Sequence, residues 1–175
     1  YIFWGRSNVG KSSLINLLTK KNLAKTSKTP GRTKSLVFFQ FKKQFRIVDF
    51  PGYGFSYIPE KKVIKLDNLI EGYLKKRENI KKIFLLFDSR HLIKPIDRII
   101  LESLLEIQNN ELNFIFTKTD KIRPLDKKKL SENIESVSKE FNKNIFHTSI
   151  KESNGIVLLK KFIHKSLDTK IGQNF

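Results

Sequence analysis

The sequence contains no cysteine and no methionine, and its only alanine is Ala24. Without cysteine the chain can form neither a disulfide framework nor a cysteine-ligated metal site. No apolar run approaches the roughly 20 residues that a membrane-spanning helix needs, and no signal peptide is recognisable. These absences favour a soluble cytoplasmic protein without membrane contact. Because the chain begins inside a predicted strand, at Tyr1, we also expect that N-terminal residues are missing.

Acidic residues are scarce relative to basic ones. The chain has 35 Lys+Arg against 17 Asp+Glu, a formal net charge of +18. Such an excess favours a polyanionic partner such as RNA. However, 28 of the basic residues are lysine and isoleucine occurs 21 times, which is the usage that an AT-rich genome imposes on any soluble protein. Composition favours neither explanation over the other.

Apolar runs of strand length alternate with helical repeats along the 175 residues, which predicts an α/β fold in one domain. Strands are expected at residues 1–4, 36–41, 45–48, 83–87, 112–116 and 144–147. Helices are expected from Lys11, over residues 61–77, from Pro95, over residues 125–141 and around residues 157–163. The short turn at residues 42–44 makes its two strands antiparallel. We therefore predict a six-stranded, mostly parallel sheet with one antiparallel strand and helices on both faces.

Helical spacing also indicates which side chains share a helix face. It puts Leu14, Leu17 and Leu18 on one side of the first helix. In the helix from Pro95 it points Ile96, Ile99, Ile100, Leu104 and Ile107 inward. The closing helix carries Val157, Leu158, Phe162 and Ile163.

Residues 5–12 read Gly-Arg-Ser-Asn-Val-Gly-Lys-Ser, the G-x-x-x-x-G-K-S pattern of a phosphate-binding loop. A predicted strand precedes this loop and a predicted helix follows it, which is the context that the motif needs. Gly5 and Gly10 let the backbone curl so that its N–H groups converge, and the helix that begins near Lys11 adds the positive end of its dipole. Lys11 can then reach the β- and γ-phosphates, and Ser12 can bind Mg²⁺.

The segment Asp49-Phe50-Pro51-Gly52 follows a predicted strand directly. Asp49 can hold Mg²⁺ through a water molecule, as the corresponding carboxylate of phosphate-loop enzymes does. Gly52 has no Cβ, so its N–H can approach a γ-phosphate closely. By itself the segment also fits a simple strand-ending turn, and its position after a phosphate loop and a hairpin favours the functional interpretation.

Thr117-Lys118-Thr119-Asp120 follows another predicted strand. Asp120 can accept two hydrogen bonds from guanine that adenine does not offer, so the segment predicts GTP rather than ATP. The stem of Lys118 can lie along the face of the base. Residues 148–150 follow the last strand, where a backbone N–H could meet guanine O6, although a plain loop fits them nearly as well.

The polar loop at residues 19–35 could supply a further hydroxyl for Mg²⁺, and Thr29 and Thr33 are both candidates. Tyr53 stands where many GTPases have the glutamine that orients the attacking water, so we expect slow intrinsic hydrolysis and assign no catalytic residue. Asn8 resembles the asparagine through which some related GTPases bind K⁺, and our hypothesis is that a K⁺ ion there supplies part of the missing charge. A local backbone hydrogen bond is the alternative role for Asn8. Residues 90 and 91, an arginine and a histidine, lie at the nucleotide edge without an assigned role.

Taken in this order, the motifs resemble the G1 to G4 elements of the TrmE–Era-like, translation-factor-related GTPases. Within that class, residues 5–16, 26–33, 49–54 and 88–91 are similar to the EngB family of ribosome-assembly GTPases. The resemblance implies that residues 1–175 form one phosphate-loop NTPase G domain that hydrolyses GTP to GDP and phosphate. It further implies a switch function in large (50S) ribosomal subunit assembly, with a link to cell division and septation. We expect a monomer whose partners are GTP, GDP and the 50S precursor, that is, rRNA and ribosomal proteins.

The resemblance also implies the binding residues. Mg²⁺ would be bound by Ser12 and Thr33, and by Asp49 through water. The last loop departs from the family pattern, because it is one residue longer before Gly155 and has Ile150 in place of a small residue. The implied nucleotide contacts are Gly5, Arg6, Ser7, Asn8, Val9, Gly10, Lys11, Ser12, Gly31, Arg32, Thr33, Lys34, Ser35, Asp49, Phe50, Pro51, Gly52, Thr117, Lys118, Thr119, Asp120, Thr148, Ser149 and Ile150.

Overall fold

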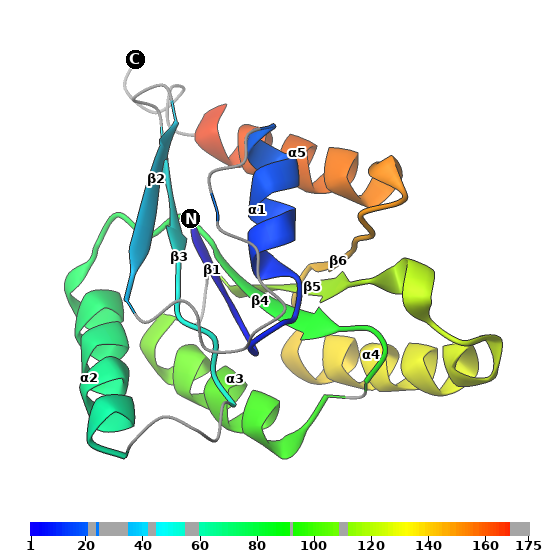
Figure 1. The fold of residues 1–175 in the computed structure, drawn as a ribbon, viewed down its shortest axis with the longest axis horizontal. Coiled ribbons are helices and arrows are strands. Elements are labelled where there is room, and N and C mark those ends of the chain that lie inside the picture. Colours follow the sequence, from blue (N-terminus) through cyan, green and yellow to red (C-terminus); the bar gives the residue numbers. More distant parts are fainter. Residues whose placement is uncertain are drawn as a thin grey trace.

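A computed structural model describes residues 1–20, 24, 35–41, 45–54, 60–91, 93–108 and 112–168. Within these residues a six-stranded sheet has the strand order β2-β3-β1-β4-β5-β6 (Figure 1). The strands are β1 (Ile2–Gly5), β2 (Val37–Phe41), β3 (Phe45–Asp49), β4 (Ile83–Asp88), β5 (Leu112–Thr117) and β6 (Ile145–His147). The helices are α1 (Lys11–Thr19), α2 (Glu60–Lys76), α3 (Pro95–Gln108), α4 (Lys127–Phe141) and α5 (Ser153–Asp168), with 3₁₀ turns η2 (Thr119–Lys121) and η3 (Pro124–Asp126).

Strand pairing confirms the predicted fold class. β2 pairs with β3 in antiparallel register, and every other neighbouring pair in the sheet is parallel. The carboxyl ends of β1, β3, β4, β5 and β6 therefore meet at one edge. The loops that follow these strands carry the predicted motifs, so the topology alone gathers them there.

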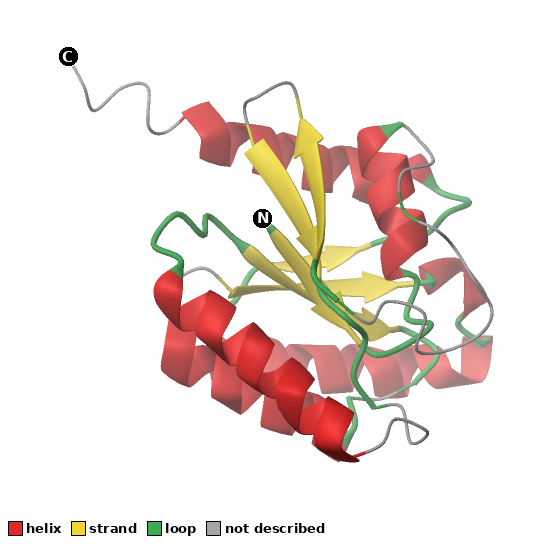
Figure 2. Cartoon of the chain, turned by 60° about the vertical axis from the view of Figure 1, so that its left-hand side comes forward, coloured by secondary structure: helices red, strands yellow, loops and turns green. Residues whose placement is uncertain are grey.

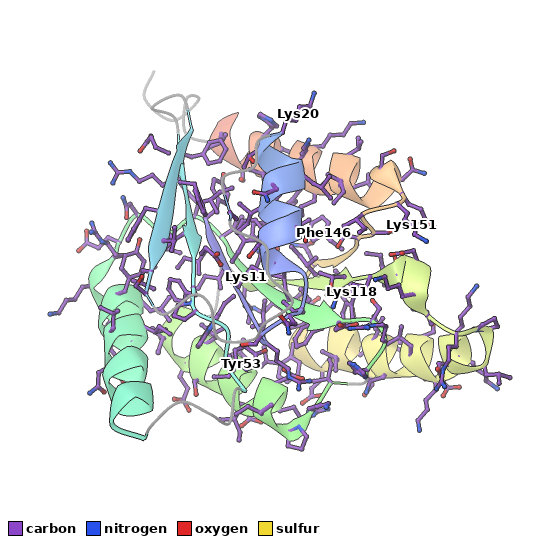
Figure 3. All side chains as sticks on the ribbon, in the orientation of Figure 1. Lys11, Lys20, Tyr53, Lys118, Phe146 and Lys151 are labelled. Carbon is purple, nitrogen blue, oxygen red and sulfur yellow. The ribbon has the colours of Figure 1, made fainter. Side chains whose placement is uncertain are left out.

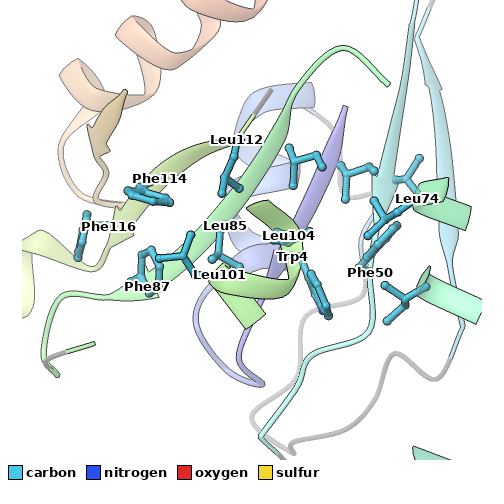
Figure 4. Packing of buried hydrophobic residues seen from close by; sticks show 14 of the residues in the cluster. Trp4, Phe50, Leu74, Leu85, Phe87, Leu101, Leu104, Leu112, Phe114 and Phe116 are labelled. Carbon is cyan, nitrogen blue, oxygen red and sulfur yellow. The ribbon is translucent and has the colours of Figure 1, made fainter. Parts of the chain in front are cut away.

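Helices cover both faces of the sheet (Figure 2). Successive side chains of β1 point to opposite faces, so Ile2 and Trp4 enter one core layer and Phe3 enters the other. The first layer packs under α2, α3 and α4, with Leu74, Leu101 and Leu104 among its members (Figure 4). The second layer packs under α1 and α5, through Leu14, Ile15, Ile156, Leu159 and Ile163.

The β4 run at residues 83–87 shows why this strand is continuously apolar. Each of its five side chains is buried, because helices lie on both sides of the sheet at this point. A strand with one face in water would alternate polar and apolar residues instead. None of the described helices is both long and apolar enough to cross a membrane.

Several helix details differ from the sequence expectations. The helix expected from residue 125 begins at Lys127, because Pro124–Asp126 forms a 3₁₀ turn that leaves Leu125 94% exposed. Ile99 was expected to point inward and is exposed, since it lies two residues, or about 200° of helix rotation, from the buried Asp97 and Leu101. On α1, Leu17 is exposed although Leu14 is buried. On α5, the buried residues are Ile156, Leu159 and Ile163, whereas Val157 and Leu158 face outward.

Gly155 explains how closely α5 approaches the sheet. A Cβ on this residue would lie 1.8 Å from the carbonyl oxygen of His147, at the end of β6. Only a residue without a side chain lets the first turn of α5 pass over this strand end. Gly72 in α2 is different, because a Cβ there would meet nothing within 4 Å.

These two glycines give the first prediction. Gly155→Ala should lower the free energy of unfolding by about 2–3 kcal/mol, because backbone must move to relieve the clash. Gly72→Ala should raise the free energy of unfolding by about 0.5–1 kcal/mol, because alanine restricts the unfolded chain and suits a helix. Urea titrations monitored by tryptophan fluorescence measure both. Equal stability of the two variants would contradict the close approach at residue 155.

Candidate nucleotide-binding site

The structure brings the predicted motifs into direct contact. Lys11 pairs with Asp49, and the N–H of Ser7 donates to the carbonyl of Tyr53 at 3.2 Å. Lys118 reaches the phosphate loop from the end of β5. Figure 3 shows Lys11, Tyr53 and Lys118 around the same edge of the sheet. These contacts join segments that are far apart in the sequence into one candidate site.

The backbone of residues 6–10 has the conformation of an anion-binding nest. Gly10 has φ of 105° and Asn8 has φ of 63°, so left-handed residues alternate with ordinary ones. Asparagine tolerates this region better than most side chains. The N–H of Val9 donates to the carbonyl oxygen of Arg6 at 3.1 Å. At the start of α1, the N–H of Leu14 donates to the carbonyl oxygen of Gly10 at 2.9 Å. The loop is thus held in shape by its own main chain.

Gly5 has a different role from the one expected. Its φ lies outside the left-handed region, so the turn does not require glycine there. A Cβ at Gly5 would instead lie 2.8 Å from the carbonyl oxygen of Leu86 in β4 and 3.1 Å from the side chain of Val9. Close packing of the loop on the neighbouring strand therefore requires this glycine, and only Gly10 supplies the backbone freedom.

Lys11 and Asp49 form a buried ion pair between α1 and β3, with 7% and 3% of their surfaces exposed. Burial raises the pKa of the Asp49 carboxyl, and the charge and hydrogen bond of Lys11 oppose this shift. The hydroxyl of Ser12 follows directly on α1. Hydroxyl and carboxylate oxygens are hard donors that suit Mg²⁺. Over the described residues no three His, Cys, Asp or Glu side chains are grouped to hold a metal by themselves.

Gly52 lies against the phosphate loop. A Cβ here would be 2.8 Å from both the backbone nitrogen and the hydroxyl of Ser7. The next side chain, Tyr53, is largely buried and donates its hydroxyl to Asp97 of α3 at 2.9 Å. Burial, and then the charge of Asp97, raise the pKa of the Tyr53 phenol, so it remains a neutral donor. The position that often holds glutamine is therefore tied to a helix.

Thr117 and Lys118 fasten the phosphate loop from the end of β5. The Thr117 hydroxyl lies 2.5 Å from the carbonyl oxygen of Val9 and 3.1 Å from that of Phe87. The Lys118 ammonium donates to the carbonyl of Asn8 at 2.6 Å. Both side chains thus bind carbonyls that face away from the nest. The predicted contact of the Lys118 stem with a base stays a prediction.

Asp120 has one carboxylate oxygen engaged and one available. Oδ1 accepts a hydrogen bond from the Ser149 hydroxyl at 2.8 Å, whereas Oδ2 is buried and makes no hydrogen bond within the described residues. Buried acceptors are normally paired, so Oδ2 calls for a donor from a ligand. The Thr119 N–H donates to the carbonyl of Thr148 at 3.3 Å, which brings the last loop to the same place. Ile150 is exposed, so its size causes no crowding.

Part of the predicted site lies outside the described residues. Gly31, Arg32, Thr33 and Lys34 are not described, and the same holds for Thr29, so the choice between the two threonines stays open. Ser35, the first described residue after this segment, is exposed.

Asp88, at the end of β4, was not assigned a role from the sequence. Its carboxylate accepts from the Lys118 ammonium at 2.7 Å and from the Arg90 guanidinium at 2.9 and 2.7 Å. Burial alone would raise the pKa of Asp88, but the hydrogen bonds from Arg90 and Lys118 outweigh it and hold the pKa below its usual range. The carboxyl end of a central parallel strand was the signal that could have identified it.

A cleft of about 180 Å³ lies beside the phosphate loop. Arg90 and His91, which also had no assigned role, line this cleft together with the phosphate loop. Its lining residues are Arg6, Ser7, Asn8, Val9, Phe87, Asp88, Arg90, His91 and Asp97.

A phosphate loop, a lysine–aspartate pair and a T-K-T-D segment, set on the carboxyl edge of this sheet, define a phosphate-loop GTPase. The comparisons agree with this class. The family model described as 50S ribosome-binding GTPase matches residues 1–118. The chain belongs to the EngB family within this class, and it is a GTPase.

Relatives and solved structures support this membership. The chain is 42% identical over 166 residues to the probable GTP-binding protein EngB of Mycoplasmopsis synoviae, covering 94% of this chain and 87% of that protein. It is 39% identical over 168 residues to the probable EngB of Rickettsia akari, covering 94% and 78%. A crystal structure of a probable GTP-binding protein EngB superimposes with a TM-score of 0.73 at 27% identity, covering 96% of this chain and 98% of that one. Aquifex aeolicus Era shares the fold, with a TM-score of 0.73 at 22% identity over 95% of this chain and 55% of that one.

Asp88 gives the second prediction. Asp88→Asn should lower the free energy of unfolding at pH 7 by about 1–2 kcal/mol, because Lys118 and Arg90 lose their charged partner. Since the folded-state pKa of Asp88 is below its unfolded value of about 3.9, this stabilisation is present above that pH and is lost as the pH falls through the folded pKa. The difference between wild type and variant should therefore shrink from pH 5 to pH 2 in urea titrations. Asp126→Asn, which breaks an exposed pair with Arg123, is the control and should change stability little at any pH.

Proposed function

We propose that this chain binds GTP with Mg²⁺ at the carboxyl edge of its sheet and uses GTP hydrolysis as a switch in assembly of the large (50S) ribosomal subunit. Two features of the site together carry the proposal. At one end Lys11 contacts Asp49, and at the other Asp120 Oδ2 has no hydrogen-bond partner among the described residues. The first suits a magnesium-bound triphosphate and the second suits guanine. The description of the matching family and the names of the relatives support the ribosomal role.

The proposed nucleotide contacts are those implied by the sequence resemblance. The main-chain amides of residues 5–12 surround the phosphates, and the ammonium of Lys11 neutralises the β- and γ-phosphate oxygens. Ser12 and Thr33 would hold Mg²⁺ directly and Asp49 through water, where the ion supplies charge neutralisation between the phosphates. Asp120 accepts from the guanine N1–H and 2-amino groups, with Ser149 fixing its orientation.

Hydrolysis by the isolated protein is proposed to be slow. The only hydrogen-bonding group on the Tyr53 side chain is its hydroxyl, which is bound to Asp97. In this conformation Tyr53 cannot orient a water molecule for attack on the γ-phosphate. The 50S precursor is therefore proposed to supply the missing activation. A cytoplasmic monomer and a link to cell division and septation complete the proposal, and they are supported by the resemblance to the family.

Base selection gives the third prediction. Wild type should bind GTP and GDP at least about 100-fold more tightly than ATP, because adenine leaves Asp120 Oδ2 unpaired. Asp120→Asn should lose guanine affinity to a similar degree and gain xanthine nucleotides, since an amide N–H can donate to the C2 oxygen of xanthine. Titrations with fluorescent analogues of GTP, GDP, ATP and XTP measure this. Ser149→Ala, which keeps the carboxylate, is the control and should retain the preference for guanine. Equal affinity of wild type for ATP and GTP would exclude the proposed site.

The proposed switch gives the fourth prediction. Turnover of GTP should rise when 50S precursors are added, and should be about tenfold higher in KCl than in NaCl if K⁺ contributes one stabilising charge of about 1.4 kcal/mol. Asn8→Gly removes the side-chain amide while keeping the left-handed backbone, so it should lose the K⁺ response and retain GDP affinity. Single-turnover assays with and without particles measure both effects. Identical rates in the two salts would remove the role of K⁺, and identical rates with and without particles would remove activation by the ribosome.

A further inference from the structure

Acidic residues are distributed unevenly over the two faces of the sheet. In the sequence, no Asp or Glu precedes Asp49 and none occurs between Ser153 and Leu167. These two segments supply α1 and α5, which pack on the same face. The helices of the opposite face all contain acids. They are Glu60, Asp67 and Glu71 on α2, Asp97, Glu102 and Glu106 on α3, and Glu132, Glu135 and Glu140 on α4.

On the face of α1 and α5, the lysines are not interspersed with acidic residues before Asp168. Lys20 ends α1 and is exposed, as Figure 3 shows, and on α5 Lys161 is exposed while Lys160 is partly buried. Burial, followed by the nearby charge of Lys20, lowers the pKa of Lys160. Helices α1 and α5 contact each other on this face, and neither carries an acidic residue before Asp168. We call Lys20, Lys160 and Lys161 the α1–α5 lysine cluster.

Several charges on the opposite face are paired, although Lys127, Lys128 and Lys129 of α4 are also exposed there. Lys139 contacts Glu135 at 2.7 Å on α4, and Arg98 of α3 contacts Glu140 of α4 at 3.2 Å. Lys75 contacts Glu71 at 2.5 Å on α2. These are ordinary solvent-exposed pairs that leave little net field. The positive potential of the folded chain is therefore stronger over α1 and α5 than over α2, α3 and α4.

This asymmetry bears on the two explanations of the net charge. A bias of the genome toward lysine codons acts on exposed positions of both faces alike, so it would leave acids on both or remove them from both. Such a bias does not account for the observed difference between the two faces. Each of α2, α3 and α4 has three acidic residues, whereas α1 has none and α5 has none before Asp168. Selection for an anionic partner on one face accounts for the observed pattern.

We propose that the α1–α5 lysine cluster binds the sugar–phosphate backbone of RNA. The inference rests on the proposed function, because the RNA in question is the rRNA of the 50S precursor. Lysine ammonium groups bind phosphates as point charges without reading bases, and their contribution falls steeply with salt. The cluster thus provides affinity and orientation rather than sequence recognition.

The position of the cluster allows RNA and nucleotide to be bound together. Lys11 stands at the first residue of α1, in the candidate nucleotide site, and Lys20 follows the last residue of this helix. Nine residues of α-helix separate their backbones by about 13 Å along the helix axis. RNA on the outer face of α1 and α5 therefore leaves the carboxyl edge of the sheet open.

An apolar protein surface is the competing occupant, because α5 also exposes Val157 (45%) and Leu158 (61%). A protein partner would bury these side chains, and its affinity would depend on them more than on the lysines. RNA would depend on the lysines. Leu158→Ser removes the apolar group at an exposed position and so separates the two occupants.

The fifth prediction compares two triple variants of equal charge in the full chain. The cluster variant combines Lys20→Gln, Lys160→Gln and Lys161→Gln. The control variant combines three substitutions at exposed positions of α4, namely Lys127→Gln, Lys128→Gln and Lys129→Gln. Binding to deproteinised 23S rRNA is measured by filter retention over a KCl series, and binding to 50S precursors is measured by sedimentation with GTP. The cluster variant should bind both at least about tenfold more weakly, with a salt slope shallower by about two, since each phosphate contact contributes about 0.7–0.9.

The control variant and Leu158→Ser should bind 23S rRNA within about twofold of wild type, and all variants should keep wild-type GDP affinity, which shows that they fold. Equal losses in the two triple variants, no loss in the cluster variant, or absence of rRNA binding by wild type would each overturn the inference. Loss of particle binding in Leu158→Ser alone would assign the face to a protein. If wild type binds 50S precursors equally with GTP and GDP, the proposed switch fails, whatever the lysine variants do to rRNA affinity.

Discussion

The site depends on how the carbonyl oxygens of the phosphate loop are satisfied. Each peptide unit that turns its N–H toward a phosphate must turn its C=O the other way, and an unpaired buried acceptor costs free energy. The end of β5 solves this problem: the Thr117 hydroxyl donates to Val9, and the Lys118 ammonium donates to Asn8. The segment predicted to recognise guanine therefore also holds the phosphate-binding loop. Asp88 extends this arrangement, because its carboxylate fixes the Lys118 ammonium from the neighbouring strand.

The other side of the phosphate loop is held by main chain. Gly52 approaches Ser7 too closely for any Cβ, and the Ser7 N–H donates to the Tyr53 carbonyl. The Tyr53 hydroxyl donates in turn to Asp97, whose second oxygen accepts from the backbone of Lys94 at the start of α3. The segment that contains Gly52 is therefore linked to α3 through the side chain of Tyr53.

The sequence predicted the parts of this structure that local pattern determines. The phosphate loop, the mostly parallel sheet with one antiparallel strand and the residues gathered at one sheet edge all follow from spacing and topology. Tertiary contacts explain what it missed. Gly5 was interpreted as a turn residue because local sequence does not reveal its close approach to Leu86, which lies on a strand distant in the sequence. The prediction that Ile99 of α3 points inward was wrong. Apolar spacing indicates only a broad stripe of the helix, and packing against the sheet determines which part of that stripe is buried. The role of Asp88 was overlooked because one of its two partners, Lys118, lies at the end of another strand, 30 residues away.

Helix α5 connects the two proposed binding surfaces physically. It follows the loop in which Ser149 orients Asp120, and Gly155 lets its first turn rest on the end of β6. Ile156, directly after Gly155, and Leu159, one turn further on, are buried against the sheet, and this packing holds the helix against the strands. Lys160 and Lys161 lie on this same helix. An RNA strand that binds these lysines is therefore placed at a fixed distance from the guanine end of the site without contacting it. The phosphate end of the site has a separate link to the helices, because the Tyr53 hydroxyl donates to Asp97 of α3.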